Sequence, residues 1–420
     1  MELEQFKAPT VTNIDAAAQR LEGIAERTPL VFNQNLSERY GAKIYLKRED
    51  YQRVRSYKIR GAYNKIAGLT ETEKANGVVC ASAGNHGQGV AFACNKLGIH
   101  GTVFMPTPTP GQKINQLKGF GGEKVDVVLV GDTFDDAFAE AMKFCERSEA
   151  TFIHPFNDPD VIAGQGTVGK EILQDIEESI DYLVLPIGGG GLASGVSTYF
   201  KERSAKTKII GVEPEGAAAM KASIDAGQLV RLEQIDKFVD GAAVKAAGAL
   251  TFQICQLKLD RVMTVPEGQV CTTLLQMYNE EAIVAEPAGV LSISALENLK
   301  DDIKGKTVVC VLSGGNNDIV RTEEIKERSL LYEGLKHYFI VSFPQRAGAL
   351  REFLVDVLGP NDDITHFQYS KKNSRERGPA VIGIELKYRK DFEGLIQRLE
   401  NLNFRYEYLN ENPELFHHLI

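Results

Sequence analysis

The chain has 420 residues, of which 43% are hydrophobic and 25% charged, with a formal net charge of −9. This length suggests two or three domains, and this composition argues against wholesale disorder. The acidic balance argues against nucleic acid as a partner, because binding phosphates requires clustered cations. No apolar run approaches the length that crosses a bilayer, so no membrane partner is expected.

The N-terminal stretch MELEQFKAPTVTNID lacks the basic and apolar regions of a secretory signal, which predicts a cytoplasmic location. The six cysteines are scattered without a C-x-x-C pair and are interpreted as reduced packing residues. No H-E-x-x-H motif occurs, and the adjacent His417 and His418 are interpreted as surface residues. These patterns predict no metal centre.

Short β-branched runs alternate with helical stretches from about residue 40 to residue 320, which is typical of βαβ units and a mostly parallel sheet. The predicted strands are, in chain order, AKIYLKRE, GVVCASAG, GTVFMP, KVDVVLVG, DYLVLPIGGGG, KIIGVEPEG and KTVVCVLSGGN. Three of these strands end in clusters of glycine, serine and asparagine, in the stretches VVCASAGNHGQG, LVLPIGGGG and VVCVLSGGNND. Ligands of open α/β sheets bind outside the carboxyl ends of strands, so we expect one site built from separate loops.

After about residue 325 the pattern changes to a βαββαβ order, the ferredoxin-like arrangement. RSLLYEGLKH is predicted as a helix or linker, and the strands that follow are YFIVSFPQ, DDITHFQYSK, PAVIGIELKY and FRYEYLNE. The two helices between them carry apolar residues at helical spacing: Leu350, Phe353, Leu354 and Val357, then Phe392, Leu395, Ile396 and Leu399. The expected bounds are 1–325 for the first domain (smaller subdomain about 55–155), 326–336 for a linker and 337–420 for the last domain.

The stretch GGGGLASG, residues 188–195, follows the apolar strand YLVLP and precedes a predicted helix. Consecutive glycines remove every Cβ from the turn, so backbone N–H groups can converge on an anion at the positive end of the helix dipole. This predicts a phosphate site, and the alternative is a merely tight turn. The loop matches neither a Walker motif nor G-x-G-x-x-G, which disfavours a nucleoside triphosphate or a dinucleotide.

Other segments supply candidate polar groups. In SAGNHGQG, Asn85 could donate its amide to a ligand oxygen, and in SGGN, Ser313 could present a hydroxyl to a ring nitrogen; helix capping is the alternative for both. In RSYKIRGAYNK, Lys58 is either one more solvated cation or a nucleophilic amine. A reactive lysine, a phosphate cradle, an amide donor and a hydroxyl together are the parts that hold pyridoxal phosphate.

Residues 1 to about 325 resemble the fold-type II pyridoxal-phosphate enzymes, the tryptophan synthase β group, and specifically the biosynthetic threonine dehydratases. The matching motifs are SYKIRGA, SAGNHGQG, GGGGL, EPAG and SGGN, in this order. The tail resembles the ACT-like regulatory domain of the same enzymes, with room for one copy. The resemblance implies an α/β fold of two open subdomains plus a ferredoxin-like domain, and conversion of L-threonine to 2-oxobutanoate and ammonia, the first step of isoleucine biosynthesis.

Roles of individual residues follow from the resemblance. It implies that Lys58 forms a Schiff base with pyridoxal phosphate, that Asn85 bonds the phenolic oxygen and that Ser313 faces the pyridine nitrogen. The phosphate would be held by the loop Gly188, Gly189, Gly190, Gly191 and Leu192. The family's loop receives the substrate carboxylate at the positions of Ser82, Gly84 and His86.

The residues around the ring also bear on the type of reaction. A neutral hydroxyl opposite the pyridine nitrogen, in place of a carboxylate, favours prompt β-elimination over transamination. The related racemases carry a serine as second base where this chain has Ala83, so racemisation is not expected. They also bind a divalent cation after GVEP, but here no aspartate follows Glu213 in EGAAAM, which predicts no essential metal.

The ACT-like domain implies control by amino acids, with isoleucine as inhibitor and valine opposing it; the alternative is a purely oligomerising domain. The family suggests a homotetramer. Two other functions stay open at this point. One is a catabolic L-serine/L-threonine dehydratase on the same scaffold, and the other is a non-catalytic amino-acid sensor with a decayed cofactor site.

Overall fold

The computed structural model describes residues 8–369, 377–412 and 416. The chain forms two compact units that divide between Asn317 and Asp318. The expected linker, 326–336, lies largely in helix α15 (Thr322–Glu333), and the next strand, β11, begins at Lys336. The domain bounds expected from the sequence stay predictions. The first residues of the chain, 1–7, and the pair His417 and His418 lie outside the described residues.

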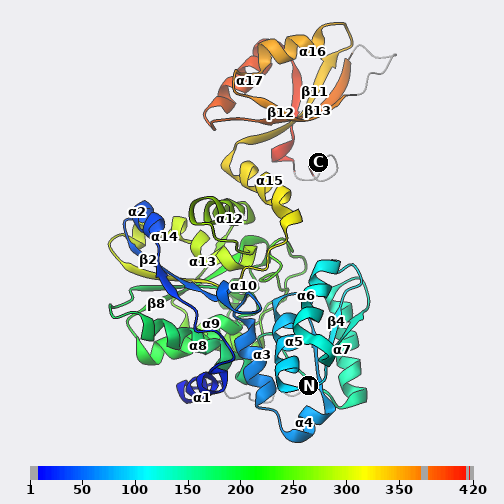
Figure 1. Cartoon of the computed structure of the whole chain (residues 1–420). Helices are drawn as coiled ribbons and strands as arrows, with labels where there is room; N and C mark the ends of the chain where they lie inside the picture. The colour runs from blue at the N-terminus through cyan, green and yellow to red at the C-terminus, as the bar shows by residue number, and fades with distance from the viewer. Residues whose placement is uncertain (1–7, 370–376, 413–415, 417–420) are drawn as a thin grey trace. The chain divides into compact units, whose positions relative to one another are not determined.

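The larger subdomain of the first unit is built on a six-stranded sheet in the order β1-β2-β10-β7-β8-β9. Figure 1 labels β2 and β8 of this sheet. Its strands are β1 (Leu30–Phe32), β2 (Lys43–Arg48), β7 (Tyr182–Pro186), β8 (Lys208–Pro214), β9 (Arg261–Val265) and β10 (Thr307–Leu312). Neighbouring strands are parallel, except that β1 is antiparallel to β2. Strands β7 and β10 are buried along their whole length, as strands covered on both faces should be.

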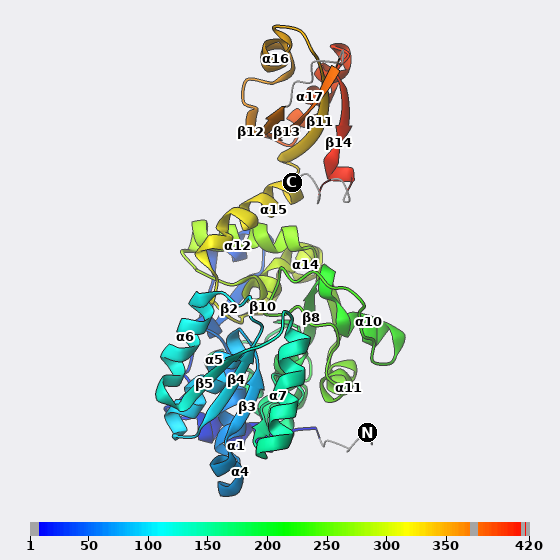
Figure 2. The same cartoon turned by 90° about the vertical axis from the view of Figure 1, so that its right-hand side faces the viewer.

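The smaller subdomain is a parallel four-stranded sheet in the order β5-β4-β3-β6. Its strands are β3 (Val78–Ala81), β4 (Gly101–Met105), β5 (Val125–Leu129) and β6 (Thr151–Phe152). Alternation along β3 decides which helices cover each face, because successive side chains point to opposite sides. Val78 and Cys80 pack with the helices α5 (Asn85–Leu97) and α6 (Gly111–Gly121), whereas Val79 and Ala81 pack with α7 (Phe134–Ser148) (Figure 2).

Helix α3 (Lys58–Ala67) connects the two subdomains, because it packs against α5 of the smaller one and against α8 (Pro159–Asp175). Helix α8 packs in turn on α9 (Gly191–Arg203), and both cover the larger sheet. The remaining helices of the first unit are α1 (Val11–Leu21), α2 (Gln34–Tyr40), α4 (Glu71–Asn76), α10 (Ala219–Ala226), α11 (Ala249–Lys258), α12 (Glu267–Glu281), α13 (Leu291–Ser294) and α14 (Leu296–Ile303). Among the described residues no helix is long and apolar enough to span a bilayer.

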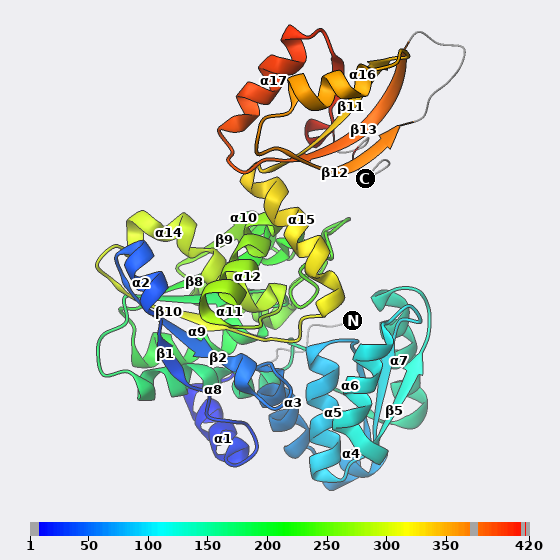
Figure 3. The same cartoon turned by 45° about the horizontal axis from the view of Figure 1, so that its top comes forward.

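The second unit contains an antiparallel sheet in the order β12-β13-β11-β14, with both helices of the βαββαβ pattern on one face (Figure 3). Besides α15, its strands and helices are β11 (Lys336–Pro344), α16 (Ala349–Glu352), β12 (Asp363–Tyr369), β13 (Arg377–Glu385), α17 (Asp391–Asn401) and β14 (Arg405–Tyr408). The ferredoxin-like arrangement predicted from the sequence is confirmed.

The first helix of this unit differs in detail from the prediction. After α16 the backbone continues as a π-helical turn over Phe353–Val357. Phe353 and Val357 are fully buried, but Leu350 and Leu354 keep 39% and 45% of their surface exposed. They lie at the edge of the apolar stripe, and the sheet is covered by the side of the helix that carries Phe353. In α17 the predicted stripe does face the core.

Candidate active site

Residues from several separated segments line one cavity at the carboxyl ends of the parallel strands. It is lined by Tyr57, Lys58, Asn85, Pro186, Ile187, Gly188, Gly241, Ala242, Glu286, Ala288 and Ser313. The structure thus brings the candidate lysine, the amide, the start of the glycine loop and the serine to one place. The fold explains this, because the carboxyl ends of parallel strands meet at the same sheet edge.

Lys58 is the first residue of helix α3, and its side chain is half-buried. Its Nζ donates a hydrogen bond of 2.8 Å to the carbonyl oxygen of Pro155. Burial lowers the pKa of Lys58 to about 8, although the nearby carboxyl of Glu286 acts in the opposite direction. About a tenth of this amine is therefore unprotonated at pH 7, compared with less than about a thousandth for an ordinary lysine, and the unprotonated form is the nucleophile.

The glycine loop joins β7 to helix α9, which begins at Gly191. Gly190 has a φ of +90°, a left-handed conformation that side chains rarely adopt. A Cβ on Gly189 would lie 2.2 Å from a ring carbon of Phe156. Thr251 Oγ1 donates a 2.6 Å hydrogen bond to the carbonyl oxygen of Gly189, and this bond holds the loop in place. The turn therefore requires glycine, and it places the positive end of the α9 dipole beside the cavity.

We expect Gly189→Ala to destabilise the protein by about 1–3 kcal/mol, because the added methyl group must displace the Phe156 ring. The affinity for pyridoxal phosphate should fall with it. The matched control is Gly119→Ala in helix α6, where an added Cβ meets nothing within 4 Å. That change should stabilise the protein by about 0.5–1 kcal/mol. Thermal unfolding and cofactor titration of both variants measure this, and equal behaviour would contradict it.

Asn85 is the first residue of helix α5, and its amide makes contacts on both sides. Its Nδ2 donates to Glu286 Oε1 at 2.6 Å, and its Oδ1 accepts from Asn316 Nδ2 at 2.7 Å. Burial raises the pKa of Glu286 to about 7, and Asp240 contributes in the same direction. Neither partner of Asn85 was predicted from the sequence. The signal was present, since Glu286 begins EPAG and Asn316 ends SGGN.

Ser313 and His86 are both buried and neutral. Ser313 Oγ donates to the carbonyl oxygen of Ala288 at 3.3 Å, and only 3% of the residue is exposed. Burial, assisted by the charge of Lys58, lowers the pKa of His86 to about 3. His86 Nε2 lies 2.8 Å from the carbonyl oxygen of Ile153, so the neutral ring donates there. The His86 ring therefore offers no positive charge to a substrate carboxylate.

The remaining loop residues are placed as follows. Ser82 Oγ accepts a 3.2 Å hydrogen bond from the N–H of Gly84, and a Cβ on Gly84 would meet nothing within 4 Å. The contact of Ser82, Gly84 and His86 with a substrate carboxylate stays a prediction.

Glu213, the residue considered for a divalent cation, caps a helix. Its two carboxyl oxygens accept from the backbone N–H groups of Met220 and Lys221 at 2.8 and 2.7 Å, at the start of α10. In the part of the chain that the structure describes, no three His, Cys, Asp or Glu side chains are grouped as a metal site requires. That the protein needs no divalent metal stays a prediction.

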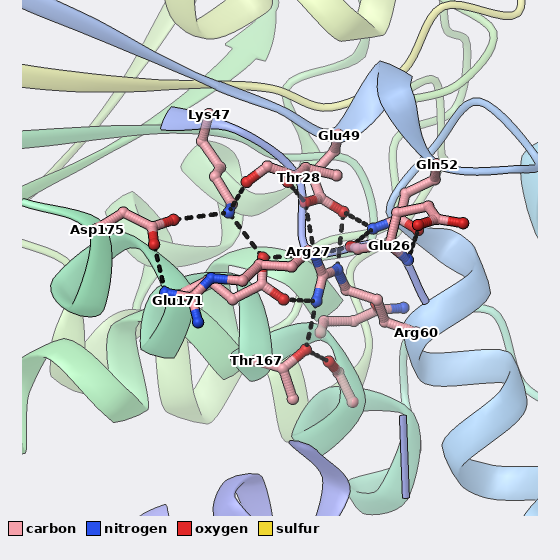
Figure 4. A network of polar contacts seen from close by, with 12 residues as sticks. Glu26, Arg27, Thr28, Lys47, Glu49, Gln52, Arg60, Thr167, Glu171 and Asp175 are labelled. Atoms are coloured by element: carbon pink, nitrogen blue, oxygen red, sulfur yellow. Dashed lines mark hydrogen bonds and ion pairs between the residues drawn. The ribbon is translucent and has the colours of Figure 1, made fainter. Parts of the chain in front are cut away.

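A buried network of charges surrounds Arg60 (Figure 4). Arg60 lies in the same helix as Lys58. Arg60 donates to both carboxyl oxygens of Glu49 at 2.8 Å each, and to both of Glu171 at 2.6 and 2.9 Å. Lys47 Nζ adds a 2.7 Å contact to Glu171. Arg60, Glu49 and Lys47 are at most 1% exposed. Burial alone would raise the pKa of Glu49, but Arg60 holds it below its ordinary value.

The donor set fits pyridoxal phosphate. An amine of lowered pKa, a hydroxyl and an amide line the same cavity, and a glycine turn at a helix N-terminus suits the phosphate. Fold and site together define a pyridoxal-phosphate enzyme of fold type II. In agreement, residues 21–314 match the family described as "Pyridoxal-phosphate dependent enzyme", and residues 327–419 match "C-terminal regulatory domain of Threonine dehydratase".

The names of similar proteins indicate the group within this family to which the chain belongs. The L-threonine dehydratase biosynthetic IlvA of Halalkalibacterium halodurans is 58% identical, covering 98% of this chain and 99% of that protein. The protein of the same name from Bacillus subtilis is 57% identical over 98% of this chain and 97% of its own length. The processed form of threonine deaminase isoform 2 from Solanum lycopersicum superposes with a TM-score of 0.72 at 38% identity, covering 78% of this chain and 97% of that one. The chain belongs to the family of the biosynthetic L-threonine dehydratases.

Proposed function

We propose that the chain deaminates L-threonine to 2-oxobutanoate and ammonia with pyridoxal phosphate as cofactor, as the first step of isoleucine biosynthesis. The full-length relatives carry the name of this activity. The observation that carries the proposal is the convergence of Lys58, Asn85, Gly188 and Ser313 on one cavity. A non-catalytic sensor would not need a lysine of lowered pKa at this point.

The bound cofactor supplies an electron-withdrawing ring that stabilises the negative charge left when the Cα proton of the substrate departs. We assign two roles to Lys58: its amine would bond to the aldehyde of the cofactor, and it would remove this proton from the substrate. The carbonyl oxygen of Pro155 orients its Nζ. Asn85 would donate to the phenolic oxygen, and the loop from Gly188 to Leu192 would hold the phosphate with its N–H groups.

Ser313 decides the strength of the electron sink. Its hydroxyl is neutral, so it can accept or donate a hydrogen bond at the ring nitrogen but cannot hold a full positive charge there. A weaker sink favours loss of the β-hydroxyl as soon as the Cα proton has been removed. In this reading Ala83, which carries no acid–base group, leaves the opposite face of the substrate without a second base.

The test is to mix the purified holoenzyme with L-threonine or L-serine and to measure keto acid and ammonia. We expect 2-oxobutanoate from threonine at a higher kcat/KM than pyruvate from serine. A preference for serine would support the catabolic serine/threonine dehydratase instead. A protein that binds the cofactor but releases no ammonia from either amino acid would support the sensor.

The lowered pKa of Lys58 predicts how the apoenzyme reacts with aldehydes. Only the unprotonated amine adds to a carbonyl, and Lys58 loses its proton through pH 8, whereas an exposed lysine does so near pH 10.4. Reductive methylation of the apoenzyme, followed by peptide mass spectrometry, should therefore label Lys58 with a half-maximal rate near pH 8. The control is the exposed Lys300, 56% exposed at its side chain, because the hydrogen bond and the charge of Glu297 raise its pKa and its labelling should therefore need a higher pH than that of Lys58. Equal profiles for both lysines would contradict the prediction.

The second unit is proposed as the site of feedback control by isoleucine, with valine opposing it. The supports are its match to a regulatory domain and its ferredoxin-like fold. We expect isoleucine to inhibit the full chain and to leave a chain that ends at Asn317 active but insensitive, since the two units are separately compact. Steady-state rates with and without isoleucine measure this. Inhibition of the shortened chain would place the effector site in the first unit.

The assembly and the location of the protein are proposed from the family alone. A homotetramer in the cytoplasm is expected, and sedimentation of the holoenzyme tests the subunit count. The six cysteines all lie among the described residues and form no disulfide there, and Cys145 alone is not fully buried, which is consistent with a reducing compartment.

A further inference from the structure

The amide of Asn85 can in principle adopt two orientations. A half turn about its last side-chain bond exchanges the oxygen and the nitrogen, which have nearly the same shape but opposite hydrogen-bonding roles. Asn85 and Glu286 line the cavity whereas Asn316 does not, so an oxygen of a bound ligand meets an N–H of Asn85 only when the amide nitrogen is on the Glu286 side. The neighbours of the amide therefore decide whether it can do what the proposed function asks of it.

Asn316 settles the orientation through a backbone carbonyl. Its Nδ2 lies 2.8 Å from the carbonyl oxygen of Val54, which can only accept a hydrogen bond. The atom of Asn316 at this position must therefore be its nitrogen. The same nitrogen lies 2.7 Å from the Asn85 amide, so Asn85 turns its oxygen towards Asn316. A third acceptor, Gln88 Oε1, lies farther away at 3.1 Å, and Gln116 Nε2 donates to Asn316 Oδ1 at 3.1 Å.

On its other side Asn85 faces Glu286, whose Oε1 accepts from Nδ2 at 2.6 Å. This contact alone does not fix the amide. Burial, with the charge of Asp240, raises the pKa of Glu286 to about 7, while Lys113 acts in the opposite direction. Near neutral pH part of the population therefore carries a protonated Glu286, and a protonated carboxyl can donate to an amide turned the other way. The Val54 carbonyl has no such second state.

We propose that Asn316 is a positioning residue that locks the orientation of the Asn85 amide and so keeps one Asn85 N–H free for a ligand oxygen in the cavity. The chain of contacts runs from the Val54 carbonyl through Asn316 to Asn85. The inference rests on the proposed contact between Asn85 and the cofactor.

The experiment compares Asn316→Asp, Asn316→Ala, Asn85→Ala and the double alanine variant with the full-length protein. Asn316→Asp replaces the amide nitrogen with a carboxylate oxygen. This oxygen would face two other acceptors, the carbonyl oxygen of Val54 and Asn85 Oδ1, and could donate to neither. The readouts are the affinity of the apoenzyme for pyridoxal phosphate and the position of the visible absorption band of the bound cofactor. Circular dichroism of each variant verifies folding, and Asn316→Ala serves where the aspartate variant does not fold.

We expect Asn316→Asp to weaken cofactor binding by about tenfold or more, the effect of losing a hydrogen bond to a charged group, and to shift the absorption band. The double variant should bind the cofactor no more weakly than Asn85→Ala, because Asn316 acts through Asn85. The matched control is the next residue, Asn317→Ala. Asn317 Oδ1 is buried without a hydrogen-bond partner among the described residues. The affinity of Asn317→Ala for pyridoxal phosphate should therefore stay within about twofold of that of the unchanged protein.

Two failures can be told apart. If Asn85→Ala binds pyridoxal phosphate as the unchanged protein does, the proposed role of Asn85 is wrong. If Asn85→Ala binds weakly but both Asn316 variants bind normally, or if the two alanine effects add, Asn316 does not act through Asn85 and this inference is overturned by itself.

Discussion

Replacing Lys58 with alanine is expected to remove the visible absorption of the holoenzyme and to lower the rate of ammonia release by more than about 10³-fold. The cavity offers no substitute, because the neighbouring titratable groups are a carboxyl, Glu286, and a phenol, Tyr57. Burial raises the pKa of Tyr57 far above neutral, so the phenol stays protonated. Neither group can form the bond to the aldehyde that we assign to Lys58.

The control for Lys58→Ala is Lys65→Ala, farther along the same helix. Lys65 makes ion pairs with Asp158 and Asp160 and does not line the cavity. Its removal should cost some stability and leave the absorption spectrum in place. Spectra and a keto-acid assay of both variants measure this. A coloured, active Lys58→Ala variant would mean that another amine performs the chemistry.

The parts of the site that lie on strand ends could be predicted from the sequence. Parallel strands with glycine-rich carboxyl ends leave little choice of where a ligand binds, so Asn85, the loop from Gly188 and Ser313 were expected to share a site. Lys58 was found differently, by the resemblance of SYKIRGA to a known motif, since no pattern of charge or spacing distinguishes it from other lysines.

What could not be predicted are contacts between residues far apart in the chain. Glu286 meets Asn85 across 201 positions, and no local signal reports a partner at that distance.

Strand β6 has only two residues, which is too few to show the alternation of side chains that is typical of a strand. The exposure of Leu350 and Leu354 could not be predicted for a different reason. The spacing of apolar residues shows which side of a helix faces the core, but not how wide the buried stripe on that side is.

The buried network around Arg60 could not be predicted for the same reason, because its members are far apart in the chain. Arg60 reaches Glu171 across 111 positions, and the sequence shows only an arginine after a lysine. The network joins strand β2 (Lys47), the turn after it (Glu49), helix α3 (Arg60) and helix α8 (Glu171). Since Lys58 begins α3, the position of its amine depends on how firmly these four elements hold together.

We therefore expect Arg60→Met to lower the free energy of unfolding by about 3–5 kcal/mol, the cost of breaking a buried ion pair. Glu49 would be left buried without its hydrogen-bonded cation and with only the charge of Lys47 acting on it, and the affinity for pyridoxal phosphate should fall as α3 loosens. Urea denaturation of the holoenzyme, followed by circular dichroism, measures the first effect, and cofactor titration of the apoenzyme measures the second. A stability within about 1 kcal/mol of the unchanged protein would show that the network does not hold α3 in place.

The matched control is Arg53→Met, which breaks an arginine–glutamate pair of equal length on the surface. Arg53 Nε lies 2.8 Å from Glu26 Oε1, and the two side chains are 49% and 48% exposed. Solvent screens this pair, so its loss should cost less than about 1 kcal/mol. Adding Glu49→Gln to Arg60→Met should recover part of the lost stability, because the second change removes the stranded charge. If the double variant were less stable than Arg60→Met alone, the loss would come from packing around the arginine side chain and not from the buried carboxylate.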